Sequence, residues 1–508
     1  MRKGKQGFRE KVTTGGNWRQ TALPSDVRSW LTTVVAVFFI YLAVSHAIFF
    51  GAAWQVPLLV GATAALVSSE WRQAGIVTLI LMTAMTALLP GVAYFDGVRA
   101  NPFVLVMSSV AVAALFGWVG SRDLLSRRLA GRIVSVVLVC LVVVNLWTPL
   151  LYGRHPFQAY GSLAAEGLRV VPQPGQYSSD AQLYLRIFHL MHSGTSYYPA
   201  VRESWKGEFG GWHPWVNPSD SLPNGVASYR LPTLFWVWSA LPSDGFAIEI
   251  LYLFFATLAV GAGAWMTSEI VSVRFAPLAA AAIAAYAMGS AMSEFVTFVD
   301  LPAMAIALVG VALFVRSLAK EDERFSWAGA AALTLAALTR EMLVYLIAFA
   351  CLSAMWAPKG VRWRRARPWI ASLAVFTVGY AAHVAAIAGQ VSGKSNVSAW
   401  LQGSPMFALD AMQRFSTFIN GGVWALPLLF TLGVLGAWGA KTRLGSQFSV
   451  FAAASLLVPI ILMLRFGNVF AGDNGVQENY WGMLIVPLAL ALWPSFALLL
   501  PVGRLRAE

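Results

Sequence analysis

Charged side chains are scarce in this chain. Asp, Glu, Lys and Arg together make up 12% of its 508 residues, whereas an average soluble protein contains about 25%. This number of charges is too small to cover the surface of a soluble protein of this length. A soluble enzyme and a disordered chain are therefore both excluded. Cysteine is scarcer still: Cys140 and Cys351 are the only two, and both stand in apolar stretches. A scaffold held together by disulfides is therefore excluded as well.

Hydrophobic residues, by contrast, make up 58% of the chain, and the mean hydropathy is +0.65. Apolar runs that approach the length needed to cross about 30 Å of hydrocarbon recur from end to end. We therefore predict an all-α polytopic membrane protein with about 14 transmembrane helices. The predicted spans lie near residues 31–50, 54–68, 75–93, 102–119, 133–152, 246–265, 275–291, 299–317, 327–339, 342–357, 368–388, 419–438, 447–465 and 480–501.

The distribution of positive charge predicts the orientation of these spans. With a cytoplasmic N-terminus, 25 of the 36 Lys and Arg residues fall in inner segments, against only 9 of the 23 Asp and Glu residues. Lys and Arg are enriched in the cytoplasmic loops of membrane proteins. We therefore predict a multi-pass protein of the cytoplasmic membrane with both termini in the cytoplasm. The net charge of +13 then reflects this asymmetry and does not point to nucleic acid as a partner.

The spans divide the chain into four parts. Residues 1–29 are a basic cytoplasmic tail, 30–132 hold additional N-terminal transmembrane helices, 133–501 form a transmembrane core, and 502–508 are a second cytoplasmic tail. The core contains the longest polar segment, the outer loop 153–245. Long loops tend to hold functional residues, and the short inner loops contain no glycine-rich phosphate motif. We therefore expect any chemistry on the outer face.

Loop 153–245 itself contains two helical patterns. Ser179 and Asp180 favour a helix start, and residues 181–192 carry an apolar stripe with helical spacing. The apolar stretch 231–241 is too short to span a membrane and is bounded by prolines, which predicts a helix lying flat on the outer surface. Both patterns predict juxtamembrane helices, and they place Asp180 at the boundary between water and lipid.

Six polar stretches follow one another on this outer side. They are residues 179–184, 194–199, 229–232, 300–302, 338–341 and 465–480. The order of these stretches, and their common position on the outer side, resemble the pattern of the GT-C superfamily of integral-membrane glycosyltransferases. The resemblance covers about residues 133–501. Three features depart from the family pattern: the spans that precede residue 133, the lack of an acidic neighbour for Asp180, and Leu301 between Asp300 and Pro302.

The resemblance implies an enzyme that moves a monosaccharide, with inversion, from a polyprenyl-phosphate carrier to a glycolipid, an envelope glycan or a protein. Such chemistry needs a base for the acceptor hydroxyl and cations for the departing phosphate. By the resemblance, Asp180 is the catalytic base, and Arg340, with Arg230 or Arg465, binds the donor phosphate. The remaining expected substrate contacts are Glu294, Asp300, Glu341, Tyr197, Tyr198, Glu478 and Tyr480.

Most of these residues also have a structural explanation. Asp180 and Asp300 are favourable helix caps, and Arg340 equally suits an anchor at the lipid headgroups or a partner of Glu341. His189 and His192 are spaced like metal ligands, but no carboxylate stands at a fixed spacing nearby. We predict no metal ligands and leave a divalent cation open as a cofactor.

Two other functions compete with glycosyl transfer. One is a transporter or flippase of a lipid-linked or anionic substrate. Transporters bind near the bilayer midplane and often have inverted repeats, whereas here charged residues gather on one side and no repeat is evident. The other is a polysaccharide polymerase or ligase with a lipid-pyrophosphate donor, which the identity of the carrier lipid distinguishes.

Overall fold

A computed structural model of the protein describes residues 179–205, 229–242, 245–291, 297–391, 405–413, 425–465 and 476–499. Every regular element in these residues is helical, which confirms the predicted all-α class for this part of the chain. The predicted tails 1–29 and 502–508, the helices of 30–132 and the span 133–152 lie outside the described residues.

The helices fall into two groups. Three short ones come from the predicted outer loop: α7 (Ser179–His192), α8 (Tyr197–Trp205) and α9 (Thr233–Ser239). The others form a bundle: α10 (Gly245–Ile270), α11 (Ala276–Ala291), α12 (Asp300–Lys320), α13 (Glu323–Thr339), α14 (Val344–Ser353), α15 (Arg362–Ile387), α17 (Pro405–Gln413), α18 (Ala425–Gly439), α19 (Lys441–Arg465) and α21 (Val476–Leu492). Short 3-10 turns extend them at η5 (Glu341–Leu343), η6 (Ala354–Trp356), η7 (Lys359–Val361) and η10 (Trp493–Leu499).

Five described helices are long and apolar enough to cross a membrane. They are Leu251–Ile270, Asp300–Lys320, Lys359–Ile387, Lys441–Leu464 and Trp481–Leu499, and two shorter apolar helices cover Glu341–Trp356 and Leu426–Gly439. Each predicted span from 246–265 to 480–501 overlaps one of the bundle helices. The helical, apolar character of this half is thus confirmed.

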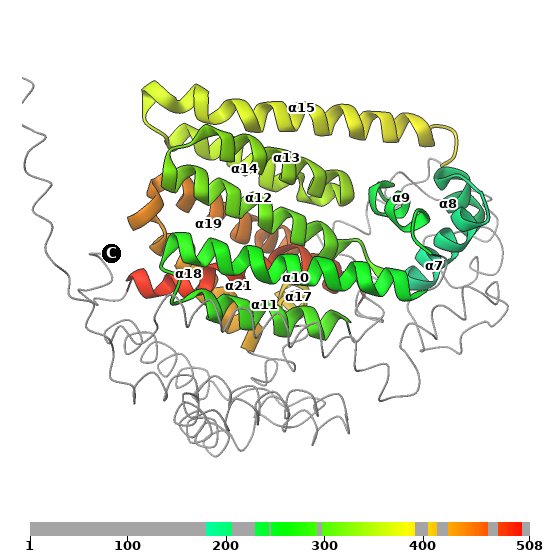
Figure 1. Cartoon of the computed structure of the whole chain (residues 1–508), viewed down its shortest axis with the longest axis horizontal. Helices are drawn as coiled ribbons and strands as arrows, with labels where there is room; N and C mark the ends of the chain where they lie inside the picture. Colours follow the sequence, from blue (N-terminus) through cyan, green and yellow to red (C-terminus); the bar gives the residue numbers. More distant parts are fainter. Residues whose placement is uncertain are drawn as a thin grey trace, which may run out of the picture.

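Burial differs sharply between the bundle helices. α12 and α21 are largely enclosed, with α12 packed between α10 and α13. α15 lies at the edge against α13 and α14 (Figure 1). Its outer side chains Val375 and Val378 are 56% and 71% exposed. An apolar face of this kind on the outside of a bundle suits contact with lipid tails.

Three glycines on α18 allow a very close helix contact. A Cβ atom at Gly436 would lie 2.1 Å from the carbonyl oxygen of Leu492, and one at Gly433 would lie 2.5 Å from that of Ala489. Gly439 meets the carbonyl oxygen of Ser495 in the same way, at 2.6 Å. All three glycines therefore serve close helix packing.

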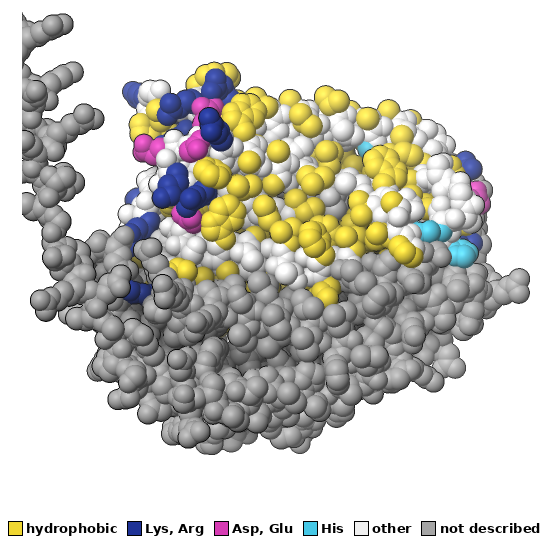
Figure 2. Space-filling model, in the orientation of Figure 1, with side chains coloured by type: hydrophobic (Ala, Val, Ile, Leu, Met, Phe, Trp, Pro, Cys, Tyr) yellow, Lys and Arg dark blue, Asp and Glu magenta, His cyan; other side chains and the backbone are white. Residues whose placement is uncertain are grey.

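The two ends of the bundle differ in chemistry. Lys, Arg, Asp and Glu side chains crowd one end of the described surface, and an apolar belt separates them from the other end (Figure 2). At that other end lie α7, α8 and α9, beside the start of α10 (Figure 1). Because α12 and α13 form an antiparallel hairpin, the start of α12 and the end of α13 also reach this side. We refer to it as the α7–α9 end.

Candidate functional site

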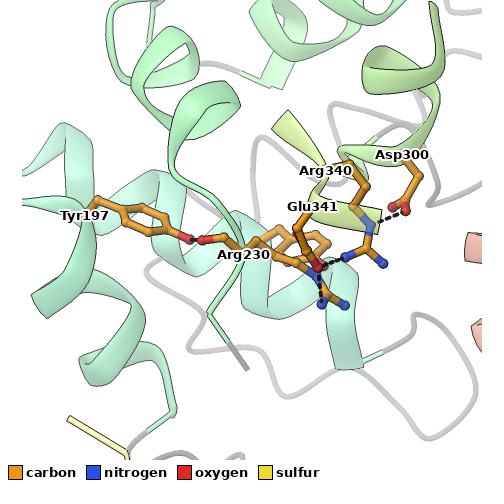
Figure 3. A network of polar contacts seen from close by, with 6 residues as sticks. Tyr197, Arg230, Asp300, Arg340 and Glu341 are labelled. Carbon is orange, nitrogen blue, oxygen red and sulfur yellow. Dashed lines mark hydrogen bonds and ion pairs between the residues drawn. The ribbon is translucent and has the colours of Figure 1, made fainter. Parts of the chain in front are cut away.

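Three ionisable side chains of the α12–α13 hairpin meet at the α7–α9 end. Asp300 is the first residue of α12, and Arg340 and Glu341 directly follow α13. Arg340 Nε donates a hydrogen bond to Asp300 Oδ1 at 2.7 Å, and its Nη1 donates to Glu341 Oε1, also at 2.7 Å (Figure 3). One guanidinium group therefore bridges two carboxylates, which is the strong, charge-assisted kind of hydrogen bonding.

Burial makes this pairing necessary. Asp300 is fully buried, and the side chain of Arg340 is only 3% exposed. A charge in such surroundings is tolerated only when it is paired and hydrogen-bonded. Even so, the second oxygens of the two carboxylates, Asp300 Oδ2 and Glu341 Oε2, are buried without a hydrogen-bond partner among the described residues. The cluster therefore keeps unused acceptor capacity.

Arg230 adds a second cation from the segment before α9. Its Nη1 lies 3.9 Å from Glu341 Oε1, and its Nε donates to the hydroxyl of Tyr184 on α7 at 3.0 Å. The hydroxyl of Tyr197 on α8 donates to the carbonyl oxygen of Arg230 at 2.5 Å (Figure 3). Contacts with both helices thus position Arg230. We call Asp300, Arg340, Glu341 and Arg230 the ionic network.

Aromatic packing fastens the short helices over this network. Phe235 of α9 contacts the rings of Tyr184 and Tyr197, with centroids 5.7 and 5.1 Å apart. Thr233, also on α9, donates a hydrogen bond to the carbonyl oxygen of Leu338 in α13. Trp236 on the opposite side of α9 remains 55% exposed. A buried aromatic face and an exposed Trp suit the predicted helix at a membrane interface.

The surroundings shift the titration of several groups at this end. Burial tends to raise the pKa of the Glu341 carboxyl, but the guanidinium groups of Arg340 and Arg230 outweigh it and hold that pKa below its ordinary value. Burial raises the pKa of Tyr229 to about 12 and lifts the pKa of Tyr197 well above its usual range. At neutral pH, Glu341 is therefore a carboxylate and both tyrosines are neutral hydrogen-bonding groups.

His383 of α15 belongs to the same end, and the sequence reasoning missed it. Its Nδ1 lies 3.2 Å from the hydroxyl oxygen of Tyr198, and its side chain is buried. The ring of Tyr380 lies beside it, with centroids 6.0 Å apart. The available signal was a single His among alanines in an otherwise apolar span, which by itself does not distinguish a structural histidine from a functional one.

The other predicted site residues are placed less completely. Asp180 stands one helical turn before Tyr184, so the two positions share a face of α7. Arg465 ends α19, and Glu478 and Tyr480 stand in the first turns of α21. The side chains of Asp180, Arg465, Glu478 and Tyr480 lie outside the described part, as does Glu294 altogether. Their roles stay predictions.

No metal centre is found among the described residues, where no group of three or more His, Cys, Asp and Glu side chains could hold an ion. Both ring nitrogens of His192 instead lie next to carbonyl oxygens, at 2.9 Å from Phe188 and 2.7 Å from Leu241. These contacts tie the end of α7 to Leu241, two residues beyond the end of α9. His192 therefore has a structural use in joining the short helices.

The described half of the chain thus defines an apolar helical bundle with membrane-length helices and a buried ionic network at one end. Comparison with protein-family models, with curated proteins and with solved structures gives no match. A functional assignment therefore rests on the residues of this chain and on their geometry.

Proposed function

We propose that the protein is a membrane glycosyltransferase that moves a monosaccharide from a polyprenyl-phosphate carrier to an acceptor hydroxyl at the α7–α9 end. The observation that supports the proposal best is the ionic network, because two of its four charged groups, Asp300 and Arg340, are almost completely buried, and buried charges are costly unless they serve a purpose. Four of the eleven residues expected to act in such a reaction from the GT-C resemblance, Asp300, Arg340, Glu341 and Arg230, form this network.

The proposed reaction uses one base and one cation. Asp180 takes the proton of the acceptor hydroxyl, whose oxygen attacks the anomeric carbon of the sugar. The bond between that carbon and the phosphate oxygen breaks with inversion, and polyprenyl phosphate leaves with the bonding electrons. Arg230 stabilises the negative charge that develops on the phosphate. The position of Asp180 supports this pairing of roles, since Tyr184, which contacts Arg230, stands one helical turn after Asp180 on α7.

Among the described arginines, Arg230 suits the phosphate better than Arg340 does. The side chain of Arg230 is 17% exposed, against 3% for Arg340. Both Nε and Nη1 of Arg340 already serve carboxylates, and a phosphate would have to compete with them. We therefore assign Arg340 the role of a positioning residue that fixes Glu341, which in turn orients Arg230. The Glu341 carboxylate, whose side chain is 23% exposed, then suits a hydroxyl group of a sugar. The fully buried Asp300 instead holds Arg340 in place.

The position of the network favours an enzyme over a transporter. Transporters bind substrate near the membrane midplane, at interruptions in their helices. In the described spanning helices, Asp, Glu, Lys and Arg stand within two turns of a helix end, as with Asp300 at the start of α12 and Lys320 at its end. The middle of α12 is apolar. Substrate binding at the α7–α9 end fits a lipid-borne donor that enters from the bilayer surface.

The test compares strains that carry a single copy of the gene with Asp180→Asn or Arg230→Gln. Mass spectrometry of whole-cell lipids and glycans should show a product that lacks one sugar and an accumulated polyprenyl-phosphate sugar. Protein level in the membrane is measured in parallel. The expected size is about a hundredfold loss of transfer or more, because a general base and a charge-stabilising group each contribute on that order.

Arg202→Gln provides the matched control. Arg202 lies on the neighbouring α8 and its charge is partly exposed and paired with Glu203 at 3.6 Å, so this variant should retain normal glycans. If both test variants are present at normal levels and leave glycans and lipids unchanged, the proposal fails. Accumulation of a lipid-pyrophosphate glycan instead would identify the polymerase or ligase alternative. Trapping of an unmodified lipid-linked substrate in the inner leaflet would identify the transporter.

A further inference from the structure

The opposite end of the bundle carries a large excess of positive charge. Its described segments, residues 266–274, 316–326, 358–367 and 439–446, contain eleven Lys and Arg residues against four Asp and Glu. Figure 2 shows these side chains gathered beyond the apolar belt. The acids are not spread evenly among the helices there. We call this surface the basic end.

One helix that starts at the basic end carries its own negative charge. Asp322 caps α13, where its side chain accepts a hydrogen bond from the backbone nitrogen of Arg324. Glu323 stands in the first turn of the same helix and pairs with Arg367 at 2.6 Å. Acidic side chains at this position are favourable, because the first turn of a helix carries partial positive charge.

Two other helices start there without any acid. α15 begins with Arg362, and α19 begins with Lys441, and neither has an acidic residue in its first turn. Further cations follow at Arg364 and Arg365. Cations at a helix start oppose the helix dipole and repel one another. Glu323 supplies negative charge to Arg367 and Arg364 on one side of α15, but no described carboxylate pairs with Arg365 or Lys441. The arrangement is unfavourable there unless a further anion supplies the missing charge.

A buried amide at the junction of these helices lacks an acceptor. Arg365 Nη1 donates to Gln447 Oε1 at 2.8 Å, which joins α15 to α19. Gln447 is only 3% exposed, and its Nε2 is buried without a hydrogen-bond partner among the described residues. Gly445, with a φ of 79°, breaks the helix just before it, so Gln447 stands in the first turn of the long part of α19. Its Nε2 can only donate.

From these observations we propose that the junction of α15 and α19 binds the phosphate headgroup of an anionic lipid. The negative charge of the headgroup neutralises Arg365 and the exposed Arg364 and Lys441. A phosphate oxygen accepts the hydrogen bond that Gln447 Nε2 can donate. A lipid fits better than a free anion because large apolar side chains border the same segment. Met355, Trp356 and Trp363 are 58%, 55% and 69% exposed, and Trp at this level suits the boundary between headgroups and tails.

The experiment uses the purified full-length protein in a neutral detergent. Phosphatidylglycerol, phosphatidylcholine and inorganic phosphate are added separately, and the thermal unfolding midpoint is recorded as a function of concentration. We expect phosphatidylglycerol to raise the midpoint saturably at concentrations where the other two have little effect. An equal rise with phosphatidylcholine would overturn the proposal, and an equal rise with inorganic phosphate would overturn the assignment to a lipid.

Variants locate the binding to the junction. The double variant Arg364→Gln, Lys441→Gln removes two exposed charges and should weaken the apparent affinity about 25-fold, at roughly fivefold for each cation near an anionic headgroup. Gln447→Glu places a carboxylate next to Arg365, so this variant should be stable without phosphatidylglycerol and respond to it weakly. Arg324→Gln removes one charge from the same end but from the neutralised start of α13, and should change the affinity clearly less than the roughly fivefold expected for each cation at the junction.

The outcome separates a specific site from general attraction to a basic surface. No site exists at the junction if two results occur together. The loss of affinity per charge is then the same for Arg324→Gln as for the double variant, and Gln447→Glu responds normally to phosphatidylglycerol. A strong effect of Gln447→Glu together with a weak effect of Arg324→Gln is the pattern that supports the site. The result does not depend on glycosyl transfer, because lipid binding at this end is measured without substrate.

Discussion

At the scale of single residues, Arg340 is the position on which the site depends most. Replacing Arg340 with Met leaves the fully buried Asp300 without the cation that pairs with it, whereas Glu341 still faces Arg230. We expect a loss of about 3–5 kcal/mol, the range for breaking one partner out of a buried ion pair. The measurement is the unfolding midpoint of the purified protein in detergent. The variant Asp300→Asn with Arg340→Met should recover part of this loss, since the buried charge is then removed.

A surface ion pair serves as the comparison. Arg367 and Glu323 are hydrogen-bonded at 2.6 Å, but the Arg367 side chain is 47% exposed. Solvent weakens such pairs, which typically contribute about 0.2–1 kcal/mol. Arg367→Gln should therefore lower the midpoint far less than Arg340→Met. Equal effects of the two substitutions would contradict the view that burial makes the ionic network important.

The lowered pKa of Glu341 predicts a dependence on acid. A carboxyl whose folded-state pKa is below its unfolded value of about 4.3 stabilises the fold above that value and loses this contribution as the pH falls through the folded pKa. The unfolding midpoint should therefore decline below about pH 4.3, and Glu341→Gln should reduce the decline. If the unfolding midpoint of Glu341→Gln declines in acid as much as that of the wild type, other carboxylates cause the decline.

The sequence identifies the members of the network but not their pairing. Asp300, Arg340, Glu341 and Arg230 stand out as charges at the ends of apolar spans. Their contacts depend on where α12 begins, where α13 ends and where the segment before α9 lies. Packing between residues that are distant in the chain determines all three positions. His383 was missed for a related reason, because its partner Tyr198 lies 185 positions away.

At the scale of elements, the contact of α18 with α21 and η10 gives the sharpest prediction. A methyl group at Gly436 would lie 2.1 Å from a backbone carbonyl oxygen, which cannot move without shifting the helix. Gly436→Ala should cost about 1–3 kcal/mol, as expected for overpacking. The readouts are the unfolding midpoint and the fraction of protein that elutes as a single species in detergent.

Gly261→Ala is the matched control on α10. A Cβ atom at Gly261 has no heavy atom within 4 Å, and Ala favours a helix over Gly by about 1 kcal/mol. This variant should be as stable as the wild type or more so. If the two substitutions behave alike, the glycines of α18 are not needed for close packing.

Hydrophobic patterns predicted the long helices and the short helices α7 and α9, but they placed the start of α13 too late and missed α8. The predicted span 327–339 was too short to cross a membrane because it included only the apolar residues. The helix α13 itself begins earlier, at Glu323, and its first turn is charged. Helix α8 was not predicted because Pro199 stands near its start and because its nine residues, although amphipathic, are too few and too polar to form an apolar run. Pro is nevertheless compatible with the first turn of a helix, where its missing N–H has no partner to lose. Short helices of this kind are held by their contacts, as α8 is by Tyr197 and Tyr198.

At the scale of the whole molecule, the bundle has two chemically different ends. One carries the ionic network under α7, α8 and α9, and the other carries the excess of Lys and Arg (Figure 2). The network is internally paired and buried, so it adds little net charge to its end. An asymmetry of this kind determines how a membrane protein is oriented during insertion, because basic segments are retained in the cytoplasm.

The orientation can be tested with two single cysteines in a variant that lacks Cys140 and Cys351. Ser193→Cys lies in the exposed turn after α7, and Gly360→Cys lies in the exposed turn before α15. A thiol reagent that does not cross membranes should label Ser193→Cys in intact cells, but label Gly360→Cys only after permeabilisation. The reverse pattern would place the ionic network in the cytoplasm, where soluble nucleotide-activated donors are available, and would remove the main reason for a lipid-linked donor. Labelling of both positions in intact cells would show that the chain between them does not cross the membrane an odd number of times.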